Sequence, residues 1–390
     1  MRGYKRADGR IGIRNHVAVV YTVECARFVA ECIVHENPGS ELWGFAGCYS
    51  DPYAFRMLVE LGQHPNVAAV LLVSLGCEST DLVRLAESIR DAGKRVEVIT
   101  IQEVGGTLRS LASGTDIVRS MQVEAEQAPQ VPITWADLIV GIECGGSDAT
   151  SGLSANPTTG WAVDQLLQYG ATVIFSEIPE LLGTDPYLLA RARDEVVRQK
   201  IGDALDRARV LGNALNHFAI SVGNQSGGLT TIEEKSLGAL AKAGTQSIDG
   251  VLKTAERPTR GGLYLLDKVG DVGGNQLTHY EINDNDGLVS LIASGAHLLV
   301  FTTGRGSVVG SAIAPVIKIC GNPETCRRMV DDIDVDAHGI IEGTATIEQV
   351  GNVLLENIQR LAGGHLSKSE RLGHKEYCIP YKPGRACDVS

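Results

Sequence analysis

The sequence predicts an α/β fold of Rossmann-like units with mainly parallel sheets, together with a glycine-rich segment that builds the ligand site. Five short apolar runs, rich in Val, Ile and Leu, each lead into a polar or glycine-rich tip. Runs without polar alternation are typical of parallel strands buried on both faces. Because α/β proteins bind ligands where such strands end, we expect the chemistry at the tips. The runs with their tips cover residues 16–25, 68–79, 137–148, 171–180 and 297–307.

A first α/β domain is expected over residues 1–130, where apolar and amphipathic stretches alternate. Pro52 lies at a first-turn position, where proline is favoured, and Gly93 follows the last apolar turn of a helical stretch. The resulting order is β-α-β, for which right-handed crossovers are expected. Strands are predicted at 16–23, 68–75 and 96–101, and helices at 26–36, 52–64 and 81–94.

A second domain is expected over residues 131–390, because the proline-containing tract 124–137 interrupts the pattern. Glycine density over 221–345 lets backbone amides approach a ligand closely, so we expect this segment to close over the sheet edge. Residues 346–390 are expected to form a terminal helix and a polar tail. Strands are predicted at 137–142, 171–176 and 297–302, and helices at 161–169 and 185–212.

The composition excludes several classes of partner. The net charge of −12 and the pI of about 5.3 disfavour a nucleic-acid surface, which needs concentrated Lys and Arg. The longest apolar stretches are shorter than the roughly 20 residues of a membrane helix, and the N-terminal residues carry no apolar core of a signal peptide. We therefore expect a cytoplasmic protein without nucleic-acid or membrane partners, whose cysteines are mostly reduced. An anionic substrate would need a locally positive pocket.

The most specific stretch is residues 142–157, which read IECGGSDATSGLSANP. It places a thiol, a Gly-Gly turn, Ser147 and Asp148 directly after a predicted strand, and it adds Asn156 before a helix that starts near Pro157. Exposed amides at a helix start bind carboxylates or hydroxyls without further charge. Other motifs along the chain are GYKRADGRIGIRN (3–15), AGC (46–48), LGCE (75–78), SEIPE (176–180), GGLTTIEEKSLG (227–238), RPTRGGL (257–263) and FTTGRG (301–306).

In this order, and over nearly the whole chain, these motifs resemble the altronate and galactarate dehydratase family of sugar-acid dehydratases. The resemblance implies a hydro-lyase that removes water from an aldonate or aldarate through an enediolate and yields a 2-keto-3-deoxy acid. It also implies a divalent metal, usually taken to be iron(II), with manganese or magnesium as alternatives. The expected partners are a small-molecule sugar acid and further copies of the chain in a homo-oligomer.

Two departures from the family pattern leave other functions open. Single-chain members carry an N-terminal SAF-type domain, whereas this chain starts at the motif of residues 3–15, which predicts a separate small subunit. The tail GSVVGSA (306–312) is associated with members outside the galactarate branch, including the sulfolactate sulfo-lyase large subunit. The alternatives are therefore a lyase that releases sulfite from sulfolactate, and a non-catalytic partner subunit.

Removing a proton next to a carboxylate requires a general base, an acid for the leaving hydroxyl and stabilisation of the enediolate charge. Asp148 is assigned to metal binding or acid-base work because it ends the most specific motif. Lys235 and Arg305 are assigned to the substrate carboxylate, and the alternative for both is an ordinary solvated cation. Ser147 and Glu177 complete the predicted catalytic set.

Further polar groups are predicted to bind substrate. They are the side chains of Arg14, Asn156 and Arg260 and the amides of Gly304 and Gly306, each in a glycine-rich or strand-end motif. A carboxylate held by backbone amides and a guanidinium together would be bound without a large positive surface.

For the metal, the thiols of Cys48, Cys77 and Cys144 are predicted to gather, with Cys25, near one edge of the sheets. The alternative for each cysteine is a small buried residue. An oxygen-rich site with Asp148 and Glu177 is the other reading, and it suits iron(II), manganese or magnesium better than zinc. His338 follows an acidic run that is either a second metal locus or a solvated turn.

Overall fold

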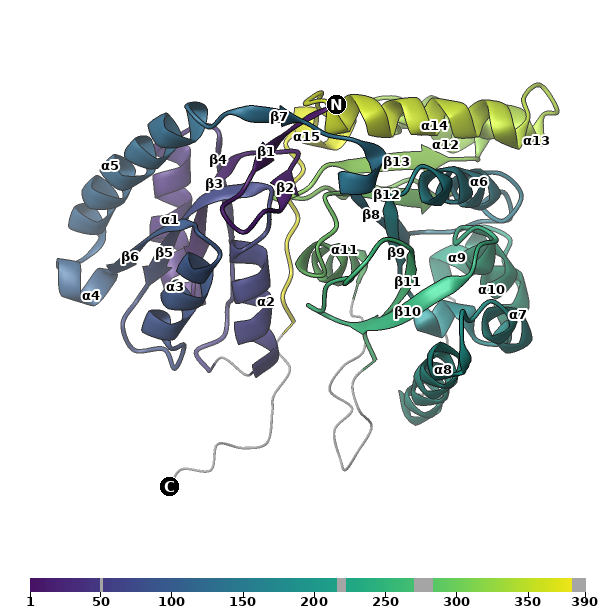
Figure 1. The fold of residues 1–390 in the computed structure, drawn as a ribbon, viewed down its shortest axis with the longest axis horizontal. Coiled ribbons are helices and arrows are strands. Elements are labelled where there is room, and N and C mark those ends of the chain that lie inside the picture. The colour runs from purple at the N-terminus through teal and green to yellow at the C-terminus, as the bar shows by residue number, and fades with distance from the viewer. Residues whose placement is uncertain (50–51, 216–221, 270–282, 381–390) are drawn as a thin grey trace. The chain divides into compact units, whose positions relative to one another are not determined.

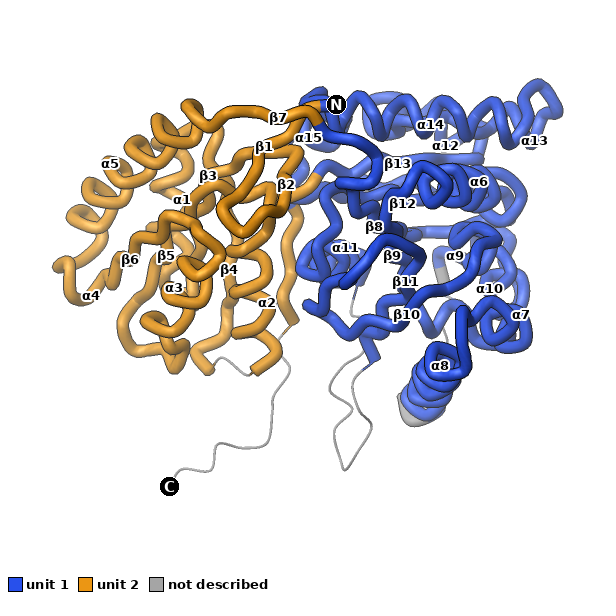
Figure 2. The backbone as a smooth tube through the Cα atoms, viewed as in Figure 1, with its two compact units in different colours: residues 1, 133–311, 315–375 blue, residues 2–132, 312–314, 376–390 orange. Residues whose placement is uncertain are grey.

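The computed structural model describes residues 1–49, 52–215, 222–269 and 283–380, and it forms two compact units (Figure 2). Each unit is built on a parallel sheet, which confirms the predicted α/β class. We call them the four-stranded unit and the seven-stranded unit. As far as they are described, the first contains residues 2–132, 312–314 and 376–390, and the second contains residues 1, 133–311 and 315–375.

The four-stranded unit has the strand order β4-β3-β5-β6, with all neighbours parallel (Figure 1). Its central strands are buried on both faces, as expected for runs without polar alternation. The strands are β3 (His16–Tyr21), β4 (Ser40–Gly44), β5 (Val67–Ser74) and β6 (Arg95–Thr100). The helices are α1 (Glu24–Glu36), α2 (Pro52–Gly62), α3 (Leu82–Asp91), α4 (Ile101–Val104) and α5 (Thr107–Glu126).

Helices α1 and α5 pack together on one face of this sheet (Figure 1). Their apolar residues Ala26, Ile33 and Met121 enter one core with Val19 and Leu71 of the strands. A short antiparallel sheet with the order β2-β1-β7 lies at the ends of the same unit's sequence. It consists of β1 (Arg2–Lys5), β2 (Ile11–Gly12) and β7 (Gln130–Pro132).

The seven-stranded unit has the order β10-β11-β9-β8-β12-β13-β14 among the described residues, and all neighbours are parallel. In sequence order the strands are β8 (Ile139–Cys144), β9 (Thr172–Phe175), β10 (Ile248–Lys253), β11 (Leu263–Asp267), β12 (Leu298–Thr303), β13 (Val316–Cys320) and β14 (Val335–Asp336). Because β8 lies near the centre, its carboxyl end is flanked by strand ends on both sides. This placement positions the thiol of Cys144 among side chains from other strands.

Helices cover both faces of this sheet. Gly141 of β8 faces α11, where an added Cβ would meet Leu291, and alternation along the strand therefore turns Cys144 to the opposite face. On that face α6 contacts β9, β12, α10 and α14. The helical elements are η1 (Trp135–Asp137), α6 (Ala155–Gln168), η2 (Ile178–Leu181), α7 (Asp185–Ala190), α8 (Glu195–Leu215), α9 (Val222–Ser226), α10 (Ile232–Ala241), α11 (Asp284–Ala293), α12 (Pro323–Arg328), α13 (His338–Ile341), α14 (Ile347–Ala362) and α15 (Lys368–Leu372).

The predicted strands are confirmed, each within two residues at its ends. The single helix predicted over 185–212 is wrong, because α7 ends at Ala190 and Asp194 starts a new helix by accepting a hydrogen bond from the Val197 amide at 2.9 Å. The glycine-rich segment 221–345, which was expected to close over the sheet edge, also contributes to the sheet. In the described part of the chain it contributes the strands β10 to β14 of the sheet itself.

Helix α6 starts at Ala155, two residues from the start expected near Pro157 and six residues before the apolar range 161–169. The difference arises because Asn156 and Thr158 lie inside the first turns, although their side chains favour loops and caps. No helix among the described residues combines the length and the apolar character that crossing a membrane requires.

Candidate functional site

The candidate site lies at the carboxyl end of β8 and β9, which pair in the seven-stranded sheet. Cys144 is the last residue of β8, and Glu177 follows β9. Glu177 has φ 75°, in the left-handed region that side chains other than glycine seldom adopt. Its backbone starts η2, which carries Glu180 back towards the end of β8. A strained position of this kind at a sheet edge is characteristic of functional sites.

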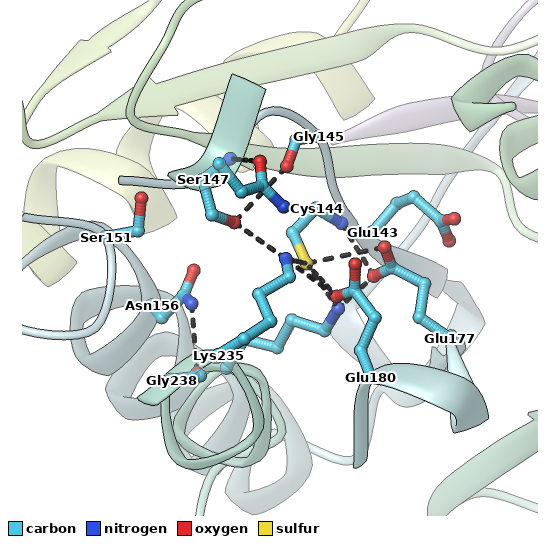
Figure 3. Close-up of polar contacts among 12 residues, drawn as sticks. Glu143, Cys144, Gly145, Ser147, Ser151, Asn156, Glu177, Glu180, Lys235 and Gly238 are labelled. Carbon is cyan, nitrogen blue, oxygen red and sulfur yellow. Dashed lines mark hydrogen bonds and ion pairs between the residues drawn. The ribbon is translucent and has the colours of Figure 1, made fainter. Parts of the chain in front are cut away.

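Two carboxylates surround the buried thiol of Cys144 (Figure 3). The Cys144 amide donates to Glu177 Oε2 at 2.8 Å, and the Cys144 sulfur lies 3.4 Å from Glu177 Oε1. The thiol donates to Glu180 Oε2 at 2.9 Å. A sulfur that contacts both carboxylates in this way holds them on the same side of the strand end.

Lys235 of α10 and Lys242, which directly follows this helix, complete the cluster. Lys235 and Lys242 are seven residues apart, which places both side chains on one face of the helix. Lys235 Nζ lies 2.8 Å from Glu180 Oε2 and 3.4 Å from Cys144 Sγ. Lys242 Nζ lies 2.9 Å from Cys144 Sγ and pairs with the Glu177 carboxylate. We call Cys144, Glu177, Glu180, Lys235 and Lys242 the thiol-lysine cluster.

Local interactions fix the approach of α10. The helix begins with a reciprocal cap, in which the Thr231 hydroxyl accepts from the Glu234 amide and the Glu234 carboxylate accepts from the Thr231 amide, both at 3.3 Å. Ser236 then donates to the Leu182 carbonyl at 2.8 Å, which ties α10 to the segment after η2. These contacts hold the lysine face of α10 against the carboxylates of η2.

The charges of the thiol-lysine cluster balance within the protein. Two ammonium groups face two carboxylates. The pKa of the Cys144 thiol is raised well above its usual value, mainly by burial and also by the negative charge of the neighbouring Glu177. Burial alone would lower the pKa of Lys242, but the Glu177 carboxylate that pairs with it raises it. Both lysines therefore stay charged and the thiol stays neutral, and a buried charged network without net charge results.

The two carboxylates of this cluster differ in their acidity. Burial opposes ionisation of Glu177, but Lys242 and Lys235 lower its pKa below the usual value. Burial and the charge of Glu177 raise the pKa of Glu180. Two neighbouring acids whose pKa values move in opposite directions are typical of sites that transfer protons. Of the two carboxylates, Glu180 is the one that is more easily protonated.

The donor atoms of Cys144, Glu177 and Glu180 lie within 4.8 Å of one another, close enough to consider a metal ion. Two ammonium groups already fill the cation positions beside them, at the distances given above. A divalent ion would have to displace Lys235 or Lys242 from its carboxylate. The cluster as it stands is therefore a poor fit for a divalent metal.

The Gly-Gly turn after β8 connects the cluster to neighbouring loops. Lys235 Nζ donates to Ser147 Oγ at 2.7 Å, so Ser147, predicted as catalytic, contacts the cluster directly (Figure 3). The amides of Gly304 and Arg305 both donate to the Gly146 carbonyl, at 2.9 and 3.0 Å. The tip of β12 is thereby held next to the tip of β8.

Asp148 is buried and its carboxylate is occupied by the chain. Its Oδ1 accepts from the Thr150 amide and hydroxyl, at 2.9 and 2.6 Å, and its Oδ2 accepts from Asn322 Nδ2 at 2.6 Å. Gly304 lies so close that an added Cβ would clash with this carboxylate. These contacts stabilise the turn, and the predicted catalytic role of Asp148 stays a prediction.

Of the predicted substrate groups, Asn156 is buried in α6. Its Nδ2 donates to the Gly238 carbonyl of α10 at 2.9 Å, and its Oδ1 has no hydrogen-bond partner among the described residues. Arg305 is exposed after β12. The Gly304 amide donates to the Gly146 carbonyl, and the Gly306 amide donates to Thr303 Oγ1, at 2.9 Å each. Both amides are therefore bound within the protein and do not point to a substrate, whereas the sequence had predicted that they would.

Two further predicted residues lie at the opposite edges of their sheets. Arg14 is buried just before β3, where its Nη1 donates to the Ile13 carbonyl at 2.9 Å. Arg260 is half-exposed just before β11, with its Nη2 3.5 Å from Asp249 Oδ1. Because both positions precede parallel strands, neither arginine is at the carboxyl edge of its own sheet.

The predicted thiols are divided between the two units. Cys25, Cys48 and Cys77 are exposed at the carboxyl edge of the four-stranded sheet, where the Ser79 amide donates to the Cys48 carbonyl at 2.8 Å. Cys144 lies in the seven-stranded unit. The four thiols thus follow strands of two sheets, and a metal site of Cys48, Cys77 and Cys144 stays a prediction.

Two cluster residues were missing from the sequence prediction. Glu180 follows Glu177 by three residues in the same SEIPE motif, and Lys242 follows Lys235 by two helical turns. Either spacing is a usable signal, since residues at such intervals share one face of a helix. The missing information was which strand end the face of α10 would meet.

Comparison with known proteins decides the family. The model of the D-galactarate/altronate dehydratase C-terminal domain matches residues 135–385, and that of the D-galactarate dehydratase/altronate hydrolase second domain matches residues 3–126. The chain belongs to the D-galactarate/altronate dehydratase family. This confirms the resemblance inferred from the motifs, and it places the protein among lyases.

Several curated relatives are similar over most of this family member. The (2R)-sulfolactate sulfo-lyase subunit beta of Chromohalobacter salexigens is 35% identical over 97% of this chain and 96% of the relative. The altronate dehydratase of Bacillus subtilis is 30% identical over 98% of this chain and 78% of its own length. The galactarate dehydratase (L-threo-forming) of Escherichia coli is 31% identical over 93% of this chain and 72% of its own length.

Proposed function

We propose that this protein eliminates water from an altronate-like aldonate or an aldarate and yields a 2-keto-3-deoxy acid. The observation that carries the proposal is the buried thiol-lysine cluster at the carboxyl edge of a parallel sheet, in a member of a dehydratase family. Elimination requires that a base remove the proton α to the carboxylate, that positive charge stabilise the enediolate, and that the 3-hydroxyl leave as water. The resulting enol then tautomerises to the keto acid.

In this proposal Lys235 stabilises the enediolate. Its ammonium is buried beside Ser147 and Glu180, and a charge in such surroundings acts more strongly than one in water. Glu180, whose pKa is raised, takes the α-proton and can return a proton to the departing hydroxyl. Glu177 and Lys242 form the charged pair that holds Cys144 and the strand end in place.

Arg305 is proposed to bind the substrate carboxylate. It is exposed, it offers a bidentate guanidinium, and its backbone is bound to the Gly146 turn that precedes Ser147. The predicted substrate contacts of Arg14 and Arg260 receive no support from their positions before the strands.

Release of sulfite from sulfolactate is the second candidate, and one observation favours it. The sulfo-lyase subunit beta and this chain match over 96% and 97% of their lengths, whereas the two dehydratases extend well beyond the match. The chemistry is related, since an α-proton and a β-substituent are lost in both reactions. The word subunit in that relative's name also supports the proposal of a separate small partner subunit for this chain.

The divalent metal, with iron(II) as the first choice and manganese or magnesium as alternatives, remains part of the proposal only at the level of the family resemblance. The thiol-lysine cluster does not suit such an ion while both lysines are charged. Each step assigned above is therefore given to groups of this chain.

The test is a substrate panel with two readouts. Purified protein, alone and with a candidate small subunit, is incubated with aldonates, aldarates and sulfolactate, and 2-keto acid and sulfite are both measured. The proposal predicts keto acid without sulfite from an aldonate or aldarate. Sulfite and keto acid in equal amounts from sulfolactate would establish the second candidate instead. No product with any member of the panel, with or without the small subunit, would contradict both.

A further inference from the structure

A second group of metal-binding side chains lies at the edge of the seven-stranded sheet, apart from the thiol-lysine cluster. Cys326 of α12, Asp336 of β14 and His338 at the start of α13 each offer a donor atom, and these atoms lie within 4.8 Å of one another. A thiol, a carboxylate and an imidazole are the ligand types that zinc combines in tetrahedral sites. We call these residues the edge cluster.

The fold holds the three residues in place independently. β14 pairs with β13 so that Asp336 lies opposite Cys320. Helix α12 starts at a fixed point, because Asn322 Oδ1 accepts from the amides of Glu324 and Thr325 at 2.9 and 3.2 Å. The Cys326 sulfur then lies 3.4 Å from the Cys320 carbonyl oxygen. The buried thiol is therefore directed at the end of β14 by its own helix.

The histidine is held from the same strand end. The His338 amide donates to Asp336 Oδ1 at 2.9 Å, and His338 Nδ1 lies 2.5 Å from the same oxygen. A proton between the imidazole and the carboxylate accounts for this contact. A metal ion can take this place when the imidazole carries its proton on Nε2, since one carboxylate oxygen would continue to accept from the amide while the other binds the ion.

Charge distinguishes the edge cluster from the thiol-lysine cluster. Lys235 and Lys242 neutralise the carboxylates around Cys144, whereas the ion pairs recorded for His338 are with the acids Asp336 and Glu342. The nearby Arg327 and Arg328 pair instead with Glu324, at 2.5 Å each. With an ionised thiol and a neutral imidazole, the three ligands carry two negative charges, which a divalent ion balances.

We propose that Cys326, Asp336 and His338 bind one zinc ion, with solvent in the fourth position of the tetrahedron. Binding forms bonds from the sulfur, a carboxylate oxygen and an imidazole nitrogen to the ion. The thiol proton leaves to solvent, and the neutral imidazole keeps its one proton on the nitrogen that does not bind the ion. The ion ties α12 to β14 and α13 at the outer edge of the sheet. A thiolate ligand favours zinc over magnesium or calcium, which prefer oxygen donors.

Cobalt(II) serves as the probe, because a thiolate ligand gives tetrahedral cobalt an intense charge-transfer absorption band. The full chain is stripped with a chelator and titrated with cobalt(II), and zinc is then added. We expect the band to saturate at one equivalent per chain and to disappear when zinc displaces cobalt. Cys326→Ser should lose the band, while Cys32→Ser, which changes a half-buried thiol of the four-stranded unit, should retain it. Cys144→Ala should also retain the band, since that thiol belongs to the other cluster.

The half-buried His338 provides a variant outside the apolar core. His338→Gln should weaken cobalt binding by a factor on the order of 100, because a ligand is lost. His365→Gln, at an exposed histidine that lies 3.0 Å from the Arg360 carbonyl, is the matched control and should bind normally. Zinc should raise the Tm of the wild type and of His365→Gln, but not that of His338→Gln. A thiolate band that persists in Cys326→Ser, normal binding by His338→Gln, or no band in the wild type would overturn the proposal.

Discussion

The carboxyl edges of the two parallel sheets carry similar sequence but different environments. Each has a cysteine next to a glutamate at the end of a central strand, in LGCE at one edge and IECGG at the other. In the four-stranded unit Cys77 is exposed, and Glu78 accepts from the Gly76 amide at 2.9 Å and from Thr22 Oγ1 at 2.6 Å. In the seven-stranded unit Cys144 is buried among charged side chains, two carboxylates and two ammonium groups. A strand end becomes a candidate active site only where a distant helix supplies cations.

The pKa values follow the same division. Burial opposes ionisation of Glu78, but hydrogen bonds from Thr22 and from the Gly76 amide lower its pKa, so it serves as a charged acceptor that closes its own loop. At the other edge the pKa of Glu180 is raised by burial and by Glu177. The first glutamate stabilises a turn as an ionised acceptor, whereas the second is more easily protonated than an ordinary glutamate.

The largest expected effect comes from removing a cation of the thiol-lysine cluster. Lys235→Gln keeps a hydrogen-bond donor near Ser147 but loses the charge, so kcat/KM should fall on the order of 100-fold to 1,000-fold. The control is Lys200→Gln, at an exposed lysine of α8, which should leave kcat/KM unchanged. Steady-state kinetics on the substrate that the panel identifies gives the comparison. Equal kcat/KM in the two variants would remove Lys235 from the mechanism.

A pH profile tests whether Glu180 is the proton acceptor. The base must be ionised, so kcat/KM should fall as pH drops through a pKa above the usual glutamate range, which is about 4.3. Glu180→Gln should remove this acidic limb together with most of the activity. Glu233→Gln, at an exposed glutamate of α10, should retain the limb. If the residual activity of Glu180→Gln shows the same acidic limb as the wild type, the limb belongs to another group.

A residue exchange tests the turn that supports the site. Asp148→Asn would bring two amide groups together, because Asn322 Nδ2 already donates to Asp148 Oδ2 at 2.6 Å. We expect the free energy of unfolding to fall by about 1–3 kcal/mol, the cost of an unsatisfied buried group. The double variant Asp148→Asn with Asn322→Asp restores a donor-acceptor pair and keeps a good helix cap, so it should regain most of that loss in urea unfolding. A double variant less stable than Asp148→Asn would show that the pair does not hold the turn.

The smallest expected effects compare the two cysteines directly. Cys144→Ala removes a buried sulfur that contacts both carboxylates, so it should lower the free energy of unfolding by about 1–3 kcal/mol. Cys77→Ala removes an exposed thiol and should change it by less than about 0.5 kcal/mol. Urea unfolding of both variants provides the measurement. Equal losses would contradict the different roles assigned to the two sheet edges.

The sequence predicted what local pattern determines. The apolar runs predicted the parallel strands, and the motif at 142–157 directed attention to the end of β8, where the candidate site lies. The strands β10 and β13 were missed because the glycine-rich surroundings of 248–253 and 316–320 suggested loops, whereas burial in the sheet decided their structure. Helix α5 was also missed, since its small and polar residues give a weak apolar period.

The composition of the cluster depended on long-range packing. Lys235 was predicted from its motif, but its partner Glu180 is 55 positions away and meets it only because α10 packs against η2. The same packing brings Lys242 to Cys144, a contact over 98 positions of sequence. No local pattern encodes such contacts, which explains why the thiols were assigned to a metal when the folded protein surrounds Cys144 with ammonium groups.

The central claim is that the thiol-lysine cluster removes the proton α to the substrate carboxylate. The most direct measurement compares turnover of the substrate carrying hydrogen or deuterium at C2, in the wild type and in Glu180→Gln. The account predicts a primary isotope effect on kcat/KM in the wild type, and in Glu180→Gln a loss of turnover on the order of 100-fold or more, as expected for a general base. Turnover of Glu180→Gln at the wild-type rate, with an unchanged isotope effect, would contradict it.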